Sequence, residues 1–262
     1  MVSEAILQLL SQPLWVFMAA LARISPVLML TPPLTSSSVP VRIRAILAVA
    51  IALLLTPIVW ANATTMPSDL LHLVIGLVGE FLIGFLLGSV MLMTVLSLQL
   101  AGQSIGHLAG FEMATAIDPS TNEDMPVLTN LFGMLATAIL LLIGGHRDIM
   151  ECAIDSFTRY PAGGVYFETH WLDELQSVFS HTFVVGMRAA APMAIALLLS
   201  NVVTSLLART LPQLNVLSVG FNINIGSLML FMLLSISSVA WVYQSELAEW
   251  INSCHRIIET DV

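Results

Sequence analysis

The chain has 262 residues, of which 57% are hydrophobic and only 10% are charged, and its formal net charge is −9. Average soluble chains carry roughly 25% charged residues, so this composition indicates an integral membrane protein. All eight basic residues are arginine, which excludes phosphate loops, Schiff bases and general bases that need a lysine. The acidic balance excludes nucleic-acid binding. The two cysteines, Cys152 and Cys254, are too few for a disulfide framework or a cysteine metal site, and we expect no cofactor.

The first apolar segment runs from Pro13 to Leu30 and contains Arg23 near its middle. An unpaired arginine near the centre of a bilayer costs at least ~2.5 kcal/mol, so we expect its side chain to face protein. The next stretch, Thr31 to Pro40, holds three prolines and three serines and is predicted to be a loop. A second apolar segment follows from Ala45 to Trp60.

A third apolar segment, Leu70 to Leu100, spans about 46 Å as a helix and exceeds the ~30 Å hydrocarbon core, so it tilts or breaks. Four residues recur in it at every fourth position and share one helix face, namely Gly76, Glu80, Gly84 and Gly88. Small residues let another backbone approach closely, and a carboxylate facing lipid is costly. The spacing therefore predicts a helix-packing face, which we expect to contact another subunit. Glu80 is also a candidate to neutralise Arg23.

The central stretch, Gly102 to Leu128, interrupts the apolar character of the chain. Gly106 and Gly110 favour a bend, and Asp118-Pro119 has turn chemistry. On these residues alone a re-entrant or pore-lining loop and a plain solvated connection are equally supported. The acidic residues Asp118, Glu123 and Asp124 fit an ion path less well than they fit turns and helix caps.

Gly102 to Gly106 also matches the spacing of a nucleophile elbow around Ser104. That motif requires a strand before the serine, whereas a long helical pattern precedes it here. We interpret the match as coincidence and do not expect an enzyme.

The second half of the chain predicts four helical segments and a tail. They are a helix at Val127 to Ile143, an amphipathic surface helix at Arg147 to Tyr160, a long helix at Trp171 to Arg209, a last span at Phe221 to Tyr243, and an acidic amphipathic tail on the surface at Glu246 to Thr260. Leu211 to Asn215 is predicted to be a turn. Ser200, Asn201, Thr204 and Ser205 are expected to make polar contacts with neighbouring helices.

Three blocks of the sequence resemble one known family. They are RISPVLMLTPPLTSSSVPVRIRAIL at Arg23 to Leu47, AGQSIGHLAGFEMATAIDPSTNEDMPVL leading into the helix that ends at His146, and LLARTLPQLNVLSVGF at Leu206 to Phe221. The family is that of the FliR-type flagellar export-gate proteins, which are the counterparts of the T subunit of type III secretion injectisomes. The resemblance covers essentially the whole chain.

The resemblance implies an all-α, multi-pass protein of the bacterial inner membrane and flagellar basal body, with broken helices and a central plug loop. It implies a gate core formed with FliP-type and FliQ-type subunits, associated with FlhB and FlhA, through which unfolded flagellar subunits pass. It further implies a P-like part at residues 1–165, with the loop at about 103–126, and a Q-like hairpin at 166–262.

Site residues follow from the resemblance and from the spacings together. The plug is assigned to residues 106–126 and specifically to Gly106, Gly110, Phe111, Met113, Asp118, Pro119, Met125 and Pro126. Subunit packing is assigned to Arg23, Gly76, Glu80, Gly84, Gly88, Asn201, Arg209, Pro212 and Gln213. Two alternatives stay open, a T subunit of a virulence-type injectisome and, less favoured, a small secondary transporter or ion channel.

Overall fold

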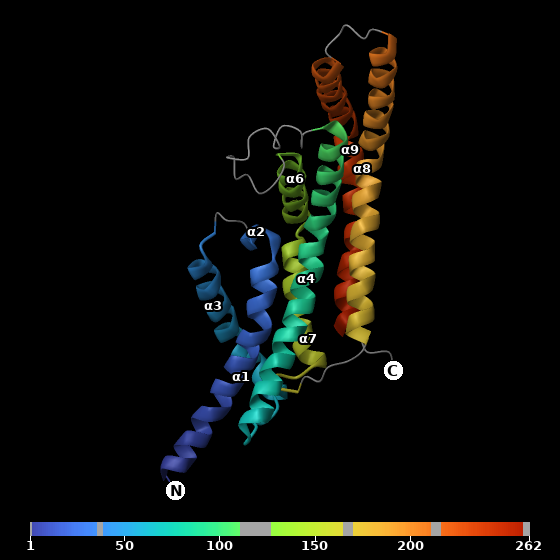
Figure 1. Ribbon diagram of the computed structural model, residues 1–262. Helices are drawn as coiled ribbons and strands as arrows, with labels where there is room; N and C mark the ends of the chain where they lie inside the picture. Colours follow the sequence, from blue (N-terminus) through green and yellow to red (C-terminus); the bar gives the residue numbers. More distant parts are fainter. Residues whose placement is uncertain (1, 36–38, 111–126, 165–169, 211–215, 259–262) are drawn as a thin grey trace. The chain divides into compact units, whose positions relative to one another are not determined.

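The computed structural model describes residues 2–35, 39–110, 127–164, 170–210 and 216–258. Within these ranges every regular element is a helix and no strand occurs, which confirms the all-α prediction. The helices are α1 (Val2–Leu30), α2 (Pro32–Thr35), α3 (Val41–Val59), the 3₁₀ helix η1 (Trp60–Asn62), α4 (Leu70–Ala109), α6 (Val127–Ile143), α7 (Gly145–Arg159), α8 (His170–Thr210) and α9 (Val216–Ile258) (Figure 1).

The chain divides into two compact units, each assembled from separate stretches. The first unit contains Met1–Met93, Leu141–Val178 and Glu249–Val262, and the second contains Thr94–Leu140 and Phe179–Ala248. Helices α4, α6, α8 and α9 each contribute residues to both units. The expected division into a P-like and a Q-like part concerns likeness to other subunits and stays a prediction.

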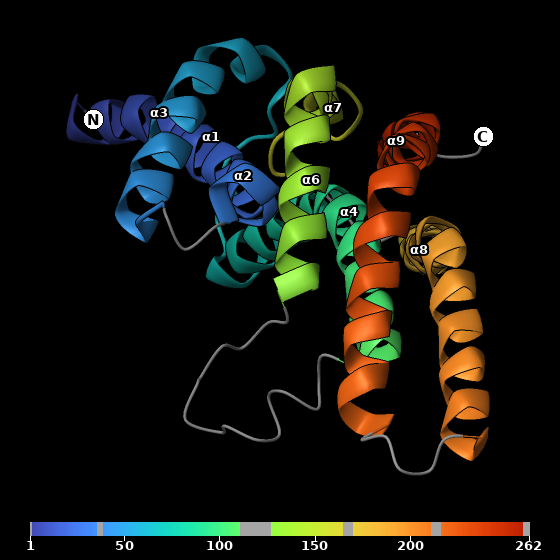
Figure 2. The same cartoon turned by 90° about the horizontal axis from the view of Figure 1, so that it is seen from above.

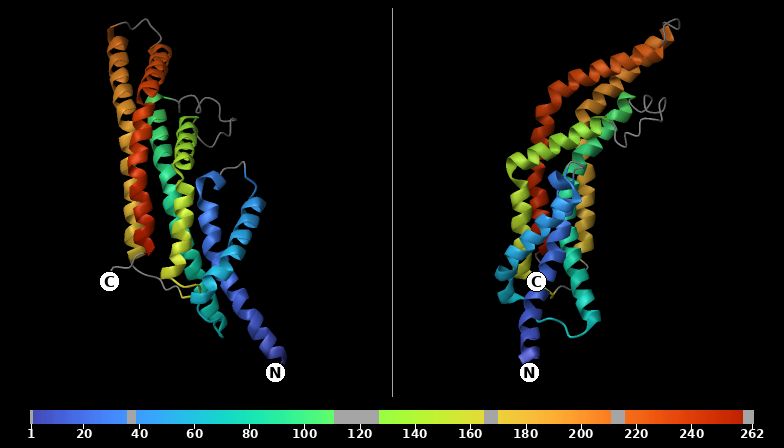
Figure 3. Two further views of the ribbon diagram at one scale, coloured as in Figure 1. Left: turned by 180° about the vertical axis from the view of Figure 1, so that it is seen from behind. Right: turned by 90° about the vertical axis from the view of Figure 1, so that its left-hand side faces the viewer.

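The first unit is built around α1. Helix α3 packs beside α1, as the front and rear views both show (Figures 1 and 3), and the N-terminal part of α4 and helix α7 meet α1 through the polar contacts described below. Trp15, Trp171 and Trp250 are almost fully buried in this unit. Because aromatic side chains bury 150–250 Å² each, these three contribute a large share of its hydrophobic stabilisation.

The second unit packs the C-terminal part of α4 between α6 and α8. A Cβ added to Gly102 of α4 would lie 2.6 Å from the carbonyl oxygen of Leu128 in α6, and one added to Gly186 of α8 would lie 2.7 Å from the carbonyl oxygen of Ser97. Such approaches need a residue without a side chain, as is common where membrane helices pack. Helices α8 and α9 run antiparallel beside each other (Figure 2).

Within the described residues, five helical segments are long and apolar enough to cross a membrane. They are Ser11–Leu30, Val41–Asn62, Leu70–Ala109, His170–Leu207 and Asn222–Ile258. A sixth results if α6 and α7, which meet at a 67° bend, form one broken span. Most of α4 is buried, whereas α3, α8 and α9 leave many large apolar side chains exposed. These exposed faces fit contact with lipid or with other subunits.

The structure corrects three sequence-based boundaries. Helix α4 continues without a break to Ala109, beyond the expected end at Leu100, because Gly102 packs against α6 instead of opening a loop. Thr31 to Pro40 contains the short helix α2. Helix α9 runs unbroken through the expected end of the span at Tyr243, since no glycine or proline follows there to stop it. The predicted turn from Leu211 to Asn215 lies outside the described residues.

The C-terminal tail is the end of α9 and has the amphipathic character expected of it. Within the first unit Trp250, Cys254 and Ile257 are buried. Only one face of this part of α9 is exposed, and it carries Glu249, which accepts a hydrogen bond from Arg256. The apolar face of this part of α9 packs against protein.

Candidate functional site

A charged centre lies in the core of the first unit. Arg23 Nε of α1 donates to Glu80 Oε2 of α4 at 2.6 Å, and both side chains are fully buried. Arg23 also donates to Ser156 Oγ of α7 at 3.0 Å and to the carbonyl oxygen of Tyr160 at 2.8 Å. The second Glu80 oxygen accepts from the backbone N–H of Gly163 at 2.7 Å. The predicted neutralisation of Arg23 by Glu80 is therefore confirmed.

The guanidinium of Arg23 is enclosed on its face as well as its edges. Its carbon atom lies 3.9 Å from the centroid of the Phe157 ring, within cation–π distance. A buried ion pair is tolerated only when hydrogen bonds satisfy its remaining donors and acceptors. This centre meets that condition inside one chain, so it joins α1, α4 and α7 and leaves no charge for a substrate.

The expected subunit-contact face of α4 instead packs against α1 of the same chain. A Cβ added at Gly84 would collide with the carbonyl oxygen of Arg23, and one at Gly88 would lie 2.9 Å from the carbonyl oxygen of Pro26. A Cβ at Gly76 would lie 3.2 Å from the Trp15 ring. The prediction of close helix packing was correct, but the partner is intramolecular, because α1 must reach Glu80 with its arginine.

In the second unit, α4 and α6 form an antiparallel stem on either side of residues 111–126. Gly102 meets the backbone of Leu128 and Thr129, and three residues earlier on α4 the side chain of Gln99 lies over Gly133. The stem ends at Gly110, whose φ of 84° lies in the left-handed region that favours glycine. The chain therefore leaves α4 through a glycine-specific bend.

Substitutions at Gly102 and Gly106 test this stem. We expect Gly102→Ala to weaken the assembly by about 1–3 kcal/mol, because its methyl group would press on the Leu128 carbonyl. Gly106→Ala is the matched control, since its nearest neighbour would be Leu128 Cδ1 at 3.9 Å and alanine favours helix. The measurement is the melting temperature of the purified assembly. Equal melting temperatures for the two variants would contradict the stem.

A polar cluster connects α8, α9 and the end of α4 in the second unit. Asn201 Nδ2 donates to the carbonyl oxygen of Leu108 at 3.2 Å, and Asn224 Nδ2 donates to Asn201 Oδ1 at 2.6 Å. Ser200 Oγ donates to Asn224 Oδ1 at 2.7 Å, and Ser227 Oγ lies 3.4 Å from Ser200 Oγ. The expected polar contacts of Ser200 and Asn201 with neighbouring helices are present, whereas Thr204 and Ser205 donate to the carbonyl oxygens of Ser200 and Asn201 within α8 itself.

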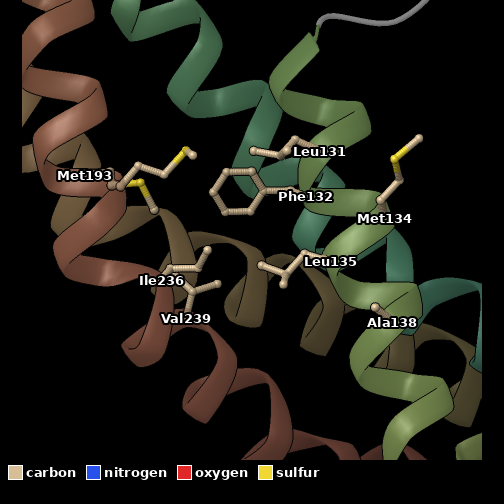
Figure 4. A pocket seen from close by; sticks show the side chains of 9 residues that line it. Leu131, Phe132, Met134, Leu135, Ala138, Met193, Ile236 and Val239 are labelled. Atoms are coloured by element: carbon tan, nitrogen blue, oxygen red, sulfur yellow. The ribbon is translucent and has the colours of Figure 1, made fainter.

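The second unit also contains an apolar cavity of about 340 Å³ between α6, α8 and α9 (Figure 4). Nine apolar residues line it, namely Leu131, Phe132, Met134, Leu135, Ala138, Met193, Met232, Ile236 and Val239. Specific binding of a small molecule requires a few placed polar groups, and these side chains supply none. The cavity suits hydrocarbon and offers no group for chemistry.

The remaining site predictions have the following outcomes. Gly106 lies inside α4 and not at a bend, and Arg209 is exposed near the end of α8. Outside the described residues lie Phe111, Met113, Asp118, Pro119, Met125, Pro126, Pro212 and Gln213. Ser104 of the apparent nucleophile elbow is in the middle of α4 and donates to the carbonyl oxygen of Leu100 at 2.8 Å, so it is a helical serine.

The sequence analysis did not predict several residues that complete these two clusters. Ser156 and Gly163 complete the charged centre from positions 133 and 83 residues away from Arg23 and Glu80, respectively. Asn224 completes the polar cluster from α9. No local pattern marks them, although an asparagine inside an otherwise apolar span is itself a signal of a buried partner.

Comparison with known proteins is consistent across most of the chain. The model of the family described as bacterial export proteins, family 1, matches residues 14–250. The flagellar biosynthetic protein FliR of Escherichia coli K12 is 32% identical over 219 residues, which cover 84% of this chain and 82% of that protein. FliR of Caulobacter vibrioides is 27% identical over 240 residues, covering 90% and 95%. The Yop proteins translocation protein T of Yersinia pestis is 26% identical over 218 residues, covering 80% and 82%.

Proposed function

The chain belongs to family 1 of the bacterial export proteins, and from that membership we propose that residues 110–126 close the channel of the export gate at rest. The chain is a component of the flagellar type III export gate in the bacterial inner membrane. Its several apolar helices fit a multi-pass protein of that membrane. The proposal adds to this a role for one segment.

The stem between α4 and α6 is the observation that carries the proposal. Gly102 locks the two helices together at Leu128, and Gly110 turns the chain out of α4 with a φ of 84°. Both ends of the segment are thus held by packed helices. The sequence assigned the bend to both Gly106 and Gly110, and of these two glycines Gly110 has the left-handed conformation while Gly106 lies within α4. A gate that must pass an unfolded chain and hold back ions is better served by a segment between fixed ends than by a rigid helix.

Phe111 and Met113 are proposed as the apolar seal, and Asp118-Pro119 as the turn that returns the chain toward Met125-Pro126. Apolar side chains close a pore by excluding water from it. Methionine is flexible and polarisable, so it adapts to a surface that must open and close again.

Deletion of Phe111–Asp118 tests the seal. The gate should assemble but leak, and we expect faster potassium efflux from liposomes that contain the purified assembly. A matched pair of variants isolates the chemistry of the seal. Phe111→Ser with Met113→Ser should leak, whereas Phe111→Leu with Met113→Leu should remain closed. An assembled deletion variant as tight as the parent would refute the proposal.

We also propose FliP-type and FliQ-type subunits as the direct partners, with FlhB and FlhA associated, and unfolded export substrates as the cargo. The exposed apolar faces of α3, α8 and α9 support this, because large exposed apolar surfaces are available for contact with other subunits. Purification of the tagged chain from native membranes should recover P-type and Q-type subunits with it. A chain recovered alone would favour the transporter alternative instead.

The match to the Yop proteins translocation protein T of Yersinia pestis shows a related family, and the T subunit of an injectisome stays the alternative to the flagellar role. The two branches differ in what the cell loses. Disruption of the gene should abolish flagellar filaments and swimming if the flagellar assignment holds. Intact motility with lost secretion of effector proteins would assign the chain to the injectisome branch.

A further inference from the structure

Helix α4 ends on a hydrogen bond that another helix supplies. The last four carbonyl groups of an α-helix have no partner within the helix. In α4 the carbonyl of His107 accepts from the backbone N–H of Gly110 at 3.1 Å, and that of Leu108 accepts from Asn201 Nδ2 of α8 at 3.2 Å. The side chain of Asn201 is therefore a cap for α4, placed two residues before the bend at Gly110.

The hydrogen bonds that support this cap run in one direction. A backbone carbonyl can only accept, so the Leu108 carbonyl fixes Asn201 with its amide nitrogen toward α4 and its oxygen toward α9. The Asn201 oxygen then requires a donor, which is Asn224 Nδ2 at 2.6 Å. The Asn224 oxygen in turn accepts from Ser200 Oγ at 2.7 Å. Each group orients the next, and such chains strengthen one another in a region of low dielectric constant.

We propose that Asn201 and Asn224 form a clamp through which the α8–α9 hairpin holds the end of α4 and thereby keeps the gate closed. This inference rests on the proposed function of residues 110–126 and identifies what controls their starting point. A movement of α8 away from α4 breaks the Asn201–Leu108 bond and leaves the Leu108 carbonyl unpaired. Opening of the gate is thereby coupled to separation of the hairpin from α4.

Asn201→Asp removes one hydrogen bond of the clamp, the bond from Asn201 to the Leu108 carbonyl oxygen. The carboxylate keeps an oxygen that accepts from Asn224, but it cannot donate to Leu108 and repels that carbonyl. The measurement uses the assembled gate, with its P-type and Q-type subunits, in liposomes. We expect the variant gate to release potassium roughly fivefold faster than the parent gate, which is the size of effect expected for a modest coupling between the clamp and the closing segment. Ser205→Ala is the matched control, because it removes a hydrogen bond to the Asn201 backbone carbonyl on the exposed side of the same helix. It should leave the efflux unchanged.

A second experiment separates the clamp from a general structural role. In the variant that lacks Phe111–Asp118, Asn201→Asp should add no further leak, because the two changes act on the same closure. An additive leak would overturn the clamp. So would an Asn201→Asp gate as tight as the parent when the deletion itself leaks. If the deletion variant does not leak, the proposed function fails instead.

Asn201→Ala extends the test in case the aspartate variant does not assemble. Alanine removes the bond to Leu108 without adding a charge, so the gate should assemble and leak. If neither variant assembles while Ser205→Ala does, the cluster is a folding contact and the clamp is overturned.

Discussion

Arg23→Met should lower the stability of the gate more than any other single change to a polar residue in the first unit. The substitution leaves the Glu80 carboxylate fully buried, with only the Gly163 N–H as a partner. Removal of one member of a buried ion pair costs about 3–5 kcal/mol, because the other charge stays behind without compensation. The carbonyl of Tyr160 and the hydroxyl of Ser156 lose a donor as well. We expect low recovery of assembled gate and a large fall in its melting temperature.

The double variant Arg23→Met with Glu80→Leu separates charge from packing. Replacement of a buried ion pair by apolar residues of similar size is often neutral. The double variant should therefore recover much of the loss, but not all of it, since the Tyr160 carbonyl and Gly163 N–H still lack their partners. A double variant less stable than Arg23→Met alone would contradict this account.

Arg188→Met is the control that removes an exposed arginine instead of a buried one. Arg188 donates to Glu246 at 2.7 Å, but its side chain is 61% exposed. Exposed ion pairs contribute about 0–1 kcal/mol, so this variant should assemble like the parent.

Much of the helical pattern was predictable from the sequence because breakers mark its boundaries. Helix α6 occupies Val127 to Ile143 as expected, between Pro126 and the left-handed Gly144. The amphipathic pattern from Arg147 to Tyr160 likewise predicted α7, which the structure places at Gly145–Arg159. In these cases local chemistry decides, since proline and glycine act on the backbone at their own positions.

The end of α4 was not predictable in the same way. Glycines at four-residue spacing indicate either a bend or a packing face, and the difference depends on whether another helix lies against them. Gly102 has the backbone of Leu128 beside it and stays helical. At Gly110, where the chain turns, none of the described residues has an atom within 4 Å of the position of a Cβ. That distinction is a property of the tertiary structure.

For the buried charges too, the sequence predicted the kind of contact but not all of the partners. The cost of an arginine in an apolar segment predicted that Arg23 would be paired, and Glu80 was the evident acid. The sequence did not predict that α1 packs against the Gly84 face, because small residues at helical spacing do not indicate which backbone approaches them. The polar cluster around Asn201 was indicated on α8, but its bond to Leu108 depends on where α4 ends.

Gly84→Ala should prevent α1 and α4 from packing, although it adds only one methyl group. The new Cβ would overlap the carbonyl oxygen of Arg23 and lie 2.7 Å from Cγ of Pro26. Backbone atoms cannot rotate away as a flexible side chain can, so α1 must move as a whole.

Glu80 lies one turn before Gly84, and such a movement would also stretch its 2.6 Å bond to Arg23. The expected loss therefore reaches or exceeds the upper end of the 1–3 kcal/mol typical of overpacking. Gly226→Ala is the control, because none of the residues that the structure describes has an atom within 4 Å of the Cβ position of this glycine of α9 and alanine favours helix there. Recovery of assembled gate and its melting temperature are the measurements, and a Gly84→Ala gate as abundant and stable as the Gly226→Ala gate would show that α1 does not lie against this face.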